Sequence, residues 1–115
     1  MIVPSGEPDD SFFEQVHSIT RQIPKGRVTT YGAIARCLGT KLSAQMVGWA
    51  MKHAIGMKPI VPTHRVVNRV GLLSAKHHYA NNGMQKLLEK EGVKIQNDTV
   101  VDFERLFWDP FEIIL

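Results

Sequence analysis

The feature that most constrains the fold is a pair of short helical patterns separated by a very short turn. One pattern runs from about Tyr31 to Leu38, and the other covers about a dozen residues after Ser43. Thr30 and Ser43 each carry a hydroxyl that can cap the helix that follows, and Gly39 ends the first helix. Two helices joined by the turn GTKL are typical of a helix-turn-helix, although many bundles show the same spacing.

The second of these helices has two chemically different faces. One face is apolar and is expected to join the core; it holds Met46, Val47, Ala50, Met51 and Ala54. The opposite face is polar and holds Gln45, Gly48, Trp49, Lys52 and His53. Gly48 has no side chain, so the backbone there can approach a groove closely. Trp49 is either presented for stacking on a sugar or base or packed beneath the loop after Ala54, and the sequence leaves both open.

The rest of the chain predicts further helices and a few short strands. An apolar stripe at helical spacing indicates a first helix that begins near Ser11 and ends before Pro24; the stripe is Phe12, Phe13, Val16, Ile19 and Ile23. The segments RVTT, IVP and RVV suit short strands, and Asn68 and Gly71 supply a turn. A last helix, from about Asn82 to Glu91 with Gly92 at its end, is expected to bury Met84, Leu87 and Leu88.

We therefore predict a single domain over residues 1–115 that is mainly α with short β. Residues 1–8 contain two prolines and a glycine and are expected to form a flexible arm. The tail DFERLFWDPFEIIL is expected to pack its aromatic side chains on the core as short extended pieces. No apolar run is long enough to span a bilayer, and the N-terminus has acids where a secretory signal has bases, which together favour a cytoplasmic protein.

Acidic and basic residues are segregated along the chain. Residues 15–88 contain no Asp or Glu but eleven Lys and Arg, whereas the two ends together hold all eleven acids and only three bases. A segregated positive field of this kind is typical of a surface that binds phosphates and releases their counterions. The pattern favours a nucleic-acid partner, and the alternative is a solvated surface with uneven charges.

The stretch VPTHRVV suggests a nucleophile and a base, Thr63 and His64. A threonine hydroxyl needs a base to take its proton, but in an extended segment neighbouring side chains point to opposite faces. We therefore expect His64 not to reach Thr63 directly, although a water could bridge them. The alternative for Thr63 is a β-branched residue that lines a small pocket.

Metal chemistry has little support in the sequence. The histidines His53, His64, His77 and His78 match no familiar zinc spacing, and the only cysteine, Cys37, lies in an apolar helical run and has the character of a buried small hydrophobe. We therefore expect no metal site and no cofactor. With one cysteine the chain cannot form an intramolecular disulfide, which fits a reducing compartment.

Several segments together resemble a known family. They are IPKGRVTTYGAIARCLG, AQMVGWAMK, and PTHRVVN followed by LLEKEGV. From about Phe12 to Val93 the chain resembles the DNA-binding domain of O6-alkylguanine-DNA alkyltransferases, which implies a winged helix-turn-helix. In those enzymes the motif is PCHRV, and its cysteine takes the alkyl group from guanine irreversibly. The corresponding residue of this chain is Thr63, so the acceptor thiol is absent.

This loss makes the chain resemble the alkyltransferase-like proteins, which are non-enzymatic relatives. The resemblance implies that the helix-turn-helix contacts the minor groove of duplex DNA, that O6-alkylguanine is bound by base flipping without alkyl transfer, and that the lesions are flagged for nucleotide excision repair. Known members often carry tryptophan at this position, so Thr63 gives the lesion pocket a smaller and more polar wall. The hydrogen-bonded His and Glu of the family correspond to His64 and Glu91, which we interpret as remnants that brace the pocket.

The resemblance also assigns the DNA contacts. Tyr31 matches the tyrosine that pushes against the phosphate 3′ to the flipped nucleotide. The arginine finger of the family falls on Gln45, which can insert and hydrogen-bond the orphaned cytosine but lacks charge and a planar fork. The predicted DNA-binding residues are Tyr31, Ala44, Gln45, Gly48, Trp49, Lys52 and Arg65. The predicted lesion pocket is formed by Thr63, His64, Val67 and Ser74.

Two other functions remain open at the level of sequence. One is an enzyme, either a transferase or hydrolase that uses Thr63 with His64 or an acceptor of alkyl groups at Cys37. The other is a sequence-specific winged-helix regulator that reads undamaged DNA in the major groove. The preferred reading is a monomer that binds double-stranded DNA containing O6-alkylguanine, recruits excision repair proteins, avoids membranes, and is cytoplasmic or, in a bacterium, nucleoid-associated.

Overall fold

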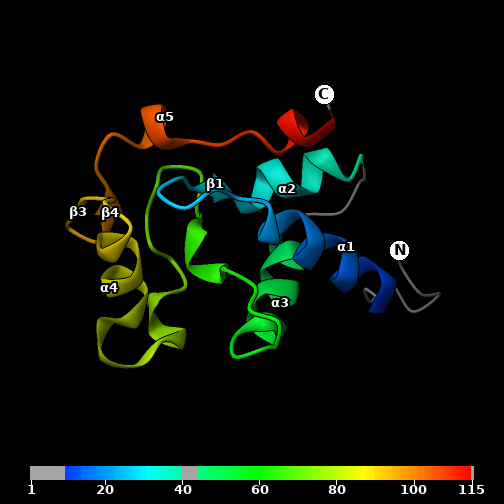
Figure 1. Ribbon diagram of the computed structural model, residues 1–115, viewed down its shortest axis with the longest axis horizontal. Helices are drawn as coiled ribbons and strands as arrows, with labels where there is room; N and C mark the ends of the chain where they lie inside the picture. The colour runs from blue at the N-terminus through cyan, green and yellow to red at the C-terminus, as the bar shows by residue number, and fades with distance from the viewer. Residues whose placement is uncertain (1–9, 40–43, 115) are drawn as a thin grey trace.

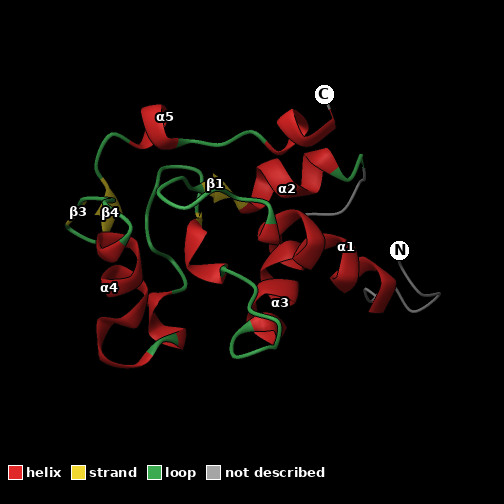
Figure 2. Cartoon of the chain, in the orientation of Figure 1, coloured by secondary structure: helices red, strands yellow, loops and turns green. Residues whose placement is uncertain are grey.

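The computed structural model describes residues 10–39 and 44–114. In Figure 1 three helices lie together on one side: α1 (Asp10–Arg21), α2 (Tyr31–Cys37) and α3 (Ala44–Ala54). On the other side lie α4 (Gly83–Lys90), β3 (Ile95–Gln96) and β4 (Thr99–Val100). The colours of Figure 2 show how little of the chain is strand, which confirms the predicted class of mainly α with short β.

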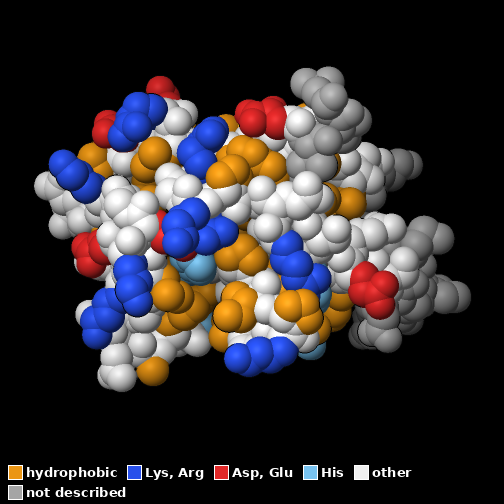
Figure 3. Space-filling view, in the orientation of Figure 1, with side chains coloured by type: hydrophobic (Ala, Val, Ile, Leu, Met, Phe, Trp, Pro, Cys, Tyr) orange, Lys and Arg blue, Asp and Glu red, His pale blue; other side chains and the backbone are white. Residues whose placement is uncertain are grey.

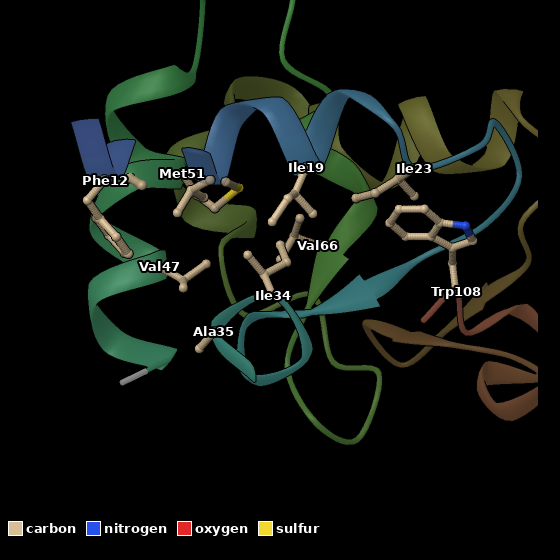
Figure 4. Close-up of a cluster of buried hydrophobic side chains, with 11 residues drawn as sticks. Phe12, Ile19, Ile23, Ile34, Ala35, Val47, Met51, Val66 and Trp108 are labelled. Atoms are coloured by element: carbon tan, nitrogen blue, oxygen red, sulfur yellow. The ribbon is translucent and has the colours of Figure 1, made fainter. Parts of the chain in front are cut away.

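The helical side is held by one apolar cluster. Its buried members come from all three helices and from the chain just after α1, and the labelled side chains converge in Figure 4; they include Phe12, Val16, Ile19, Ile23, Ile34, Val47 and Met51. The helical spacing predicted the members from α1 and α3, whereas the burial of Ile34 in α2 was not predicted. The Nε2 atom of the buried His17 lies 2.8 Å from the Ala50 carbonyl oxygen and so adds a polar link between α1 and α3.

A short parallel pairing joins the two sides of the molecule. Strand β1 (Thr29–Thr30) pairs with β2 (Val66–Val67), with Thr29 opposite Val66. Successive strand residues point to opposite faces, so Val66 packs in the helical cluster and Val67 packs in a second cluster with Leu73, Met84 and Leu88. Strand β2 therefore separates two small cores, and α4 and the β3–β4 hairpin are built on the second one.

Two of the predicted local signals have the expected geometry. The Thr30 side chain accepts a hydrogen bond of 3.0 Å from the Ala33 backbone N–H and caps α2, which fixes Tyr31 in the first turn. The Asn68 side chain accepts hydrogen bonds from the backbone N–H groups of Val70 and Leu72, and Gly71 has a φ of +87° in this turn. The predicted cap at Ser43 lies outside the described residues.

Three details differ from the sequence predictions. The segment IVP, residues 60–62, forms no strand. It is followed by a 3₁₀ helix, η1 (Thr63–Arg65), whose first carbonyl accepts a hydrogen bond from the Val66 N–H. Leu87 of α4 is 40% exposed, whereas Met84 and Leu88 are buried as predicted. The tail contains α5 (Phe103–Leu106) and the 3₁₀ helix η4 (Pro110–Ile114), the latter against α2, rather than extended pieces alone.

The remaining short helices shape the loop that faces α3. They are η2 (Lys76–His78) and η3 (Ala80–Asn82), and both pack against α4. Asn81 and Asn82 both have left-handed backbone angles, with φ of 56°, a conformation that asparagine adopts more readily than most residues. This double turn directs the chain from η2 into the start of α4.

Candidate nucleic-acid interface

A pocket of about 420 Å³ lies between α3 and the segment that contains η2. Its lining comes from four separate parts of the sequence and consists of Tyr31, Ala44, Gln45, Gly48, Trp49, Met51, Lys52, Ile55, Thr63, Ser74, Ala75, His78 and Tyr79. Most of the residues that the sequence assigned to DNA binding or to the lesion pocket are therefore brought to one place. Its volume lies within the range of about 300–1,000 Å³ that is common for small-ligand sites.

The exposed face of α3 forms one wall of this pocket. Gln45 and Lys52 are exposed, and Trp49 is 43% exposed, so this indole is presented at the surface rather than buried beneath the following loop. A Cβ added at Gly48 would meet no atom within 4 Å. No internal packing requires glycine there, and the bare backbone leaves room for an approaching ligand.

Two phenols line the pocket near Thr63. The Thr63 and Tyr79 hydroxyl groups are hydrogen-bonded to each other. Burial raises the pKa of Tyr31, and a hydrogen bond with the Ser74 side chain opposes this effect. Burial also raises the pKa of Tyr79, against the opposing effect of its bond to Thr63. Both phenols are therefore neutral at physiological pH and can donate as well as accept hydrogen bonds.

His64 faces a buried ionic cluster outside this pocket. The His64 Nε2 lies 2.8 Å from a Glu91 carboxylate oxygen, and the Arg65 guanidinium donates to both Glu91 oxygens at 3.0 and 2.7 Å. The Gly26 backbone N–H donates to the same carboxylate at 3.3 Å, and Arg65 also donates to the Ile23 carbonyl oxygen at 2.8 Å. The cluster therefore ties η1 to the end of α4 and to the chain after α1.

The charge states of this cluster follow from its contacts. Burial alone would raise the pKa of Glu91, but hydrogen bonds from Arg65, His64 and Gly26 lower it to about 2. Burial lowers the pKa of His64, and this outweighs the opposing effect of Glu91. At neutral pH Glu91 is an anion that can only accept, so the neutral His64 donates its Nε2 proton to it. This supports the interpretation of His64 and Glu91 as a structural brace.

Four expectations for the site differ from what the structure shows. His64, predicted to line the lesion pocket, is not among the residues that line it. Arg65, predicted to contact DNA, is held by Glu91 and by the Ile23 carbonyl, with a side chain only 14% exposed. Val67, predicted to line the lesion pocket, is fully buried in the second core because strand alternation turns it away from Val66. The premise of an extended Thr63–His64 segment is wrong because these residues begin a 3₁₀ helix. Even so, their side chains bind different partners, Tyr79 and Glu91.

Tyr79 is the principal pocket residue that sequence reasoning missed. It follows η2, where the chain has no periodic apolar pattern, and it meets Thr63 across 16 positions of sequence. No signal in the segment KHHYANN indicates this contact. His78 also lines the pocket, and its ring lies 4.1 Å from that of His77 between centroids. Within residues 10–39 and 44–114, no group of three or more His, Cys, Asp or Glu side chains is placed to hold a metal ion.

The basic residues of the acid-free segment are spread over the surface. Figure 3 shows Lys and Arg side chains across the face in view, with most of the visible carboxylates toward its edges. Two basic side chains of that segment form ion pairs with acidic residues from the C-terminal part of the chain: Arg65 with Glu91, and Lys76 with Asp98 at 2.5 Å. Lys52 remains exposed beside the pocket. In the part of the chain that the structure describes, no helix is long and apolar enough to cross a membrane.

Comparison with known proteins relates this pocket to a family. The sequence is 38% identical over 106 residues to alkyltransferase-like protein 1 of Schizosaccharomyces pombe, covering 88% of this chain and 97% of the relative. It is 37% identical over 103 residues to the DNA base-flipping protein of Escherichia coli, covering 90% and 78% of the two chains.

A solved structure gives the same relationship. The crystal structure of S. pombe Atl1 in complex with damaged DNA containing O6-carboxymethylguanine superposes with a TM-score of 0.73 and 34% sequence identity, covering 88% of this chain and 97% of that one. Residues 11–93 match the family described as 6-O-methylguanine DNA methyltransferase, DNA binding domain. With both the sequence and the fold in agreement, this chain belongs to the family of the 6-O-methylguanine DNA methyltransferase DNA-binding domain.

Proposed function

We propose that this protein binds O6-alkylguanine in duplex DNA, with the damaged nucleotide turned out of the helix into the pocket between α3 and η2, and that it does not transfer the alkyl group. The observation that carries the proposal is the pocket itself. It lies beside the exposed face of α3 and is lined by Thr63, the residue that the sequence resemblance aligns with the acceptor cysteine.

Base flipping supplies part of the selectivity in this proposal. Extruding a nucleotide costs a few kcal/mol and costs least where pairing is already weak, as it is for an O6-alkylated guanine. Gln45 is exposed at the start of α3 and can fill the vacated space in the stack. Tyr31, in the first turn of α2, lines the pocket and is the residue proposed to press on the phosphate. Exposed basic side chains such as Lys52 add affinity for phosphates that does not depend on the DNA sequence.

The absence of alkyl transfer follows from the chemistry of the pocket. Transfer would break the bond between the guanine O6 and the alkyl carbon, form a bond from that carbon to the acceptor, and require loss of the acceptor proton. A threonine hydroxyl performs this step only with a base beside it. The Thr63 hydroxyl is hydrogen-bonded to the Tyr79 hydroxyl, while the His64 Nε2 is hydrogen-bonded to the Glu91 carboxylate. Cys37, the only cysteine of the chain, is not part of the pocket lining.

The names of the relatives support the same function. Relatives of similar length are called alkyltransferase-like protein and DNA base-flipping protein, and the structure of S. pombe Atl1 contains damaged DNA. A protein that holds a lesion without repairing it is useful only if another system removes the damage. We therefore include in the proposal that the bound complex is handed to nucleotide excision repair.

A paired binding and mass measurement tests the proposal. Fluorescence anisotropy at fixed salt compares two duplexes that differ only in one base, O6-methylguanine or guanine, and mass spectrometry of the protein follows. The expected result is at least about tenfold tighter binding of the lesion duplex, with an unchanged protein mass. Equal affinity for the two duplexes would reject lesion recognition, and a mass increase of one methylene would reject the claim that no transfer occurs.

A matched pair of variants tests where the DNA lies. Lys52→Ala removes a positive charge beside the pocket. Arg105→Ala removes an exposed positive charge on α5, which Figure 1 shows far from α3. Loss of one phosphate contact weakens binding about equally for both duplexes and reduces the salt dependence. The expected result is weaker binding for Lys52→Ala alone, and equal losses for the two variants would place the DNA elsewhere.

A further inference from the structure

A second hollow adjoins the proposed lesion pocket and shares part of its lining. This hollow, of about 300 Å³, is lined mainly by apolar side chains that include Ile55, Met57, Ile60, Val61 and Leu87. Three residues, Ile55, Thr63 and Tyr79, line both hollows. Of these, Thr63 and Tyr79 are linked by the hydrogen bond between their hydroxyl groups. The wall between the two spaces therefore includes a pair of side chains joined by a single polar contact.

Tyr79 is held through its backbone, its Cβ and its hydroxyl group. Its backbone N–H donates to the Lys76 carbonyl oxygen at 3.0 Å and closes η2. A Cβ added at Gly83 would lie 3.4 Å from the Tyr79 Cβ, so the start of α4 packs closely against this tyrosine. The phenol oxygen is held by Thr63, which is itself buried. These contacts hold the ring between η2, the start of α4 and Thr63, where it lines both hollows.

We propose that the hydrogen-bonded pair of Thr63 and Tyr79 limits the size of the O6 substituent that the pocket accepts, and that Tyr79 is the residue that sets this limit. The inference rests on the proposed function, in which Thr63 takes the place of the alkyl acceptor and therefore faces the alkyl carbon. A methyl group fits in front of the pair. A longer or aromatic substituent meets the Thr63–Tyr79 contact and enters the apolar hollow only after that contact is broken.

Two lesions of different size in one duplex sequence test this limit. The probes are O6-methylguanine and O6-benzylguanine, and the measured quantity is the ratio of their dissociation constants for each protein. The wild-type protein is expected to bind the methyl lesion about tenfold more tightly, which corresponds to about 1.4 kcal/mol. Tyr79→Ala removes the tyrosine ring and is expected to reduce this ratio to about one or below, because the benzyl ring then reaches the apolar hollow.

A second substitution separates the hydrogen bond from the bulk of the ring and provides for the case in which Tyr79→Ala does not fold. Tyr79→Phe keeps the ring and removes the bond to Thr63. It is expected to reduce the ratio by about fivefold, which is the order of a net neutral hydrogen bond. Circular dichroism and thermal unfolding verify that each variant is folded before its ratio is measured.

Filling the hollow from its other side gives the matched control. Leu87 lines the second hollow and is partly exposed, so Leu87→Trp in the Tyr79→Ala background should fill the space and restore the preference for the methyl lesion. Lys86→Trp, at the neighbouring exposed position on α4, should leave the ratio of the Tyr79→Ala variant unchanged.

The outcomes distinguish this inference from the proposed function. If the wild-type protein does not prefer O6-methylguanine over guanine, the proposed function itself fails. If it does, but binds the benzyl lesion as tightly as the methyl lesion, or if neither Tyr79 variant changes the ratio, only the size limit is refuted. Restoration of the ratio by Lys86→Trp as well as by Leu87→Trp would also refute it, since the effect would then not arise in the hollow.

Discussion

The brace formed by Glu91 makes a quantitative prediction about stability. Its side chain is 9% exposed and accepts hydrogen bonds from Arg65, His64 and the Gly26 backbone N–H. Glu91→Gln keeps the size of the side chain but removes the negative charge, and its amide nitrogen cannot accept a hydrogen bond. The Arg65 guanidinium, itself only 14% exposed, then remains as a charge without its counterion.

Two routes give similar magnitudes for this loss. The pKa of Glu91 falls from 4.5 to about 2 in the folded protein, which by linkage corresponds to about 3 kcal/mol of stabilisation at neutral pH. Breaking a buried ion pair by removing one partner costs about 3–5 kcal/mol. We therefore expect Glu91→Gln to lower the free energy of unfolding by about 3 kcal/mol, which is a large part of the stability of a small domain.

The same pKa predicts the dependence of this stabilisation on pH. Because the pKa of Glu91 is lower in the folded than in the unfolded state, its contribution is fully present above pH 4.5 and is lost as the pH falls toward 2. Protonation of His64 adds to acid sensitivity below pH 6.5, since burial lowers its pKa and disfavours the charged form in the folded state. The wild-type protein should therefore lose stability across this range.

Urea unfolding at several pH values measures both effects. The difference in the free energy of unfolding between the wild-type protein and Glu91→Gln should shrink as the pH falls from 4.5 toward 2. Asp102→Asn is the control, because Asp102 is exposed, pairs only with Arg105 among the described ion pairs, and has a left-handed backbone that asparagine tolerates. Its expected cost is below about 1 kcal/mol. A loss under about 1 kcal/mol for Glu91→Gln, or parallel pH curves for it and the wild-type protein, would refute the reasoning.

Four shorter predictions concern the core, a turn and the DNA surface. Thr29→Val should raise the free energy of unfolding by about 1 kcal/mol in urea titration, because the buried Thr29 Oγ1 has no hydrogen-bond partner among the described residues. Gly71→Ala should lower the melting temperature through a loss of about 1–2 kcal/mol, since φ is +87° and the new Cβ would lie 3.1 Å from the Phe103 ring. Gln45→Arg should tighten binding of the lesion duplex by about fivefold, as measured by anisotropy, through charge-assisted contacts. The logarithm of the wild-type binding constant should fall with the logarithm of salt concentration with a slope of about −4 or steeper, and a slope near zero would contradict the basic interface.

The helical half of the fold was predictable because its signals are local. Helical spacing alone selects Phe12, Val16 and Ile19 for the core, and one hydroxyl, that of Thr30, fixes where α2 begins. The face of α3 is equally clear, since Val47 and Met51 are buried while Lys52 is exposed. In each case the physical cause acts within one or two helical turns, so one segment of sequence contains it.

Orientation between segments was not predictable in the same way. Leu87 and Leu88 both satisfy the helical spacing with Met84, and the rotation of α4 against the second core decides that Leu88 is buried and Leu87 is not. Val66 and Val67 are both apolar, so the sequence shows that both faces of β2 are covered but not by what. The assignment of Val67 to the lesion pocket failed for this reason.

The charge pattern shows the same limit and has a consequence for DNA binding. Segregation along the sequence is not segregation in space, because Glu91 and Asp98 lie beyond the acid-free segment yet fold back against Arg65 and Lys76, which belong to it. These two basic side chains already form ion pairs in the free protein, so DNA phosphates would have to compete with carboxylates for them. A DNA footprint estimated from the eleven bases of the segment is therefore too large. For the proposed interface, the relevant Lys and Arg side chains are those that the fold leaves exposed near α3, of which Lys52 lines the pocket itself.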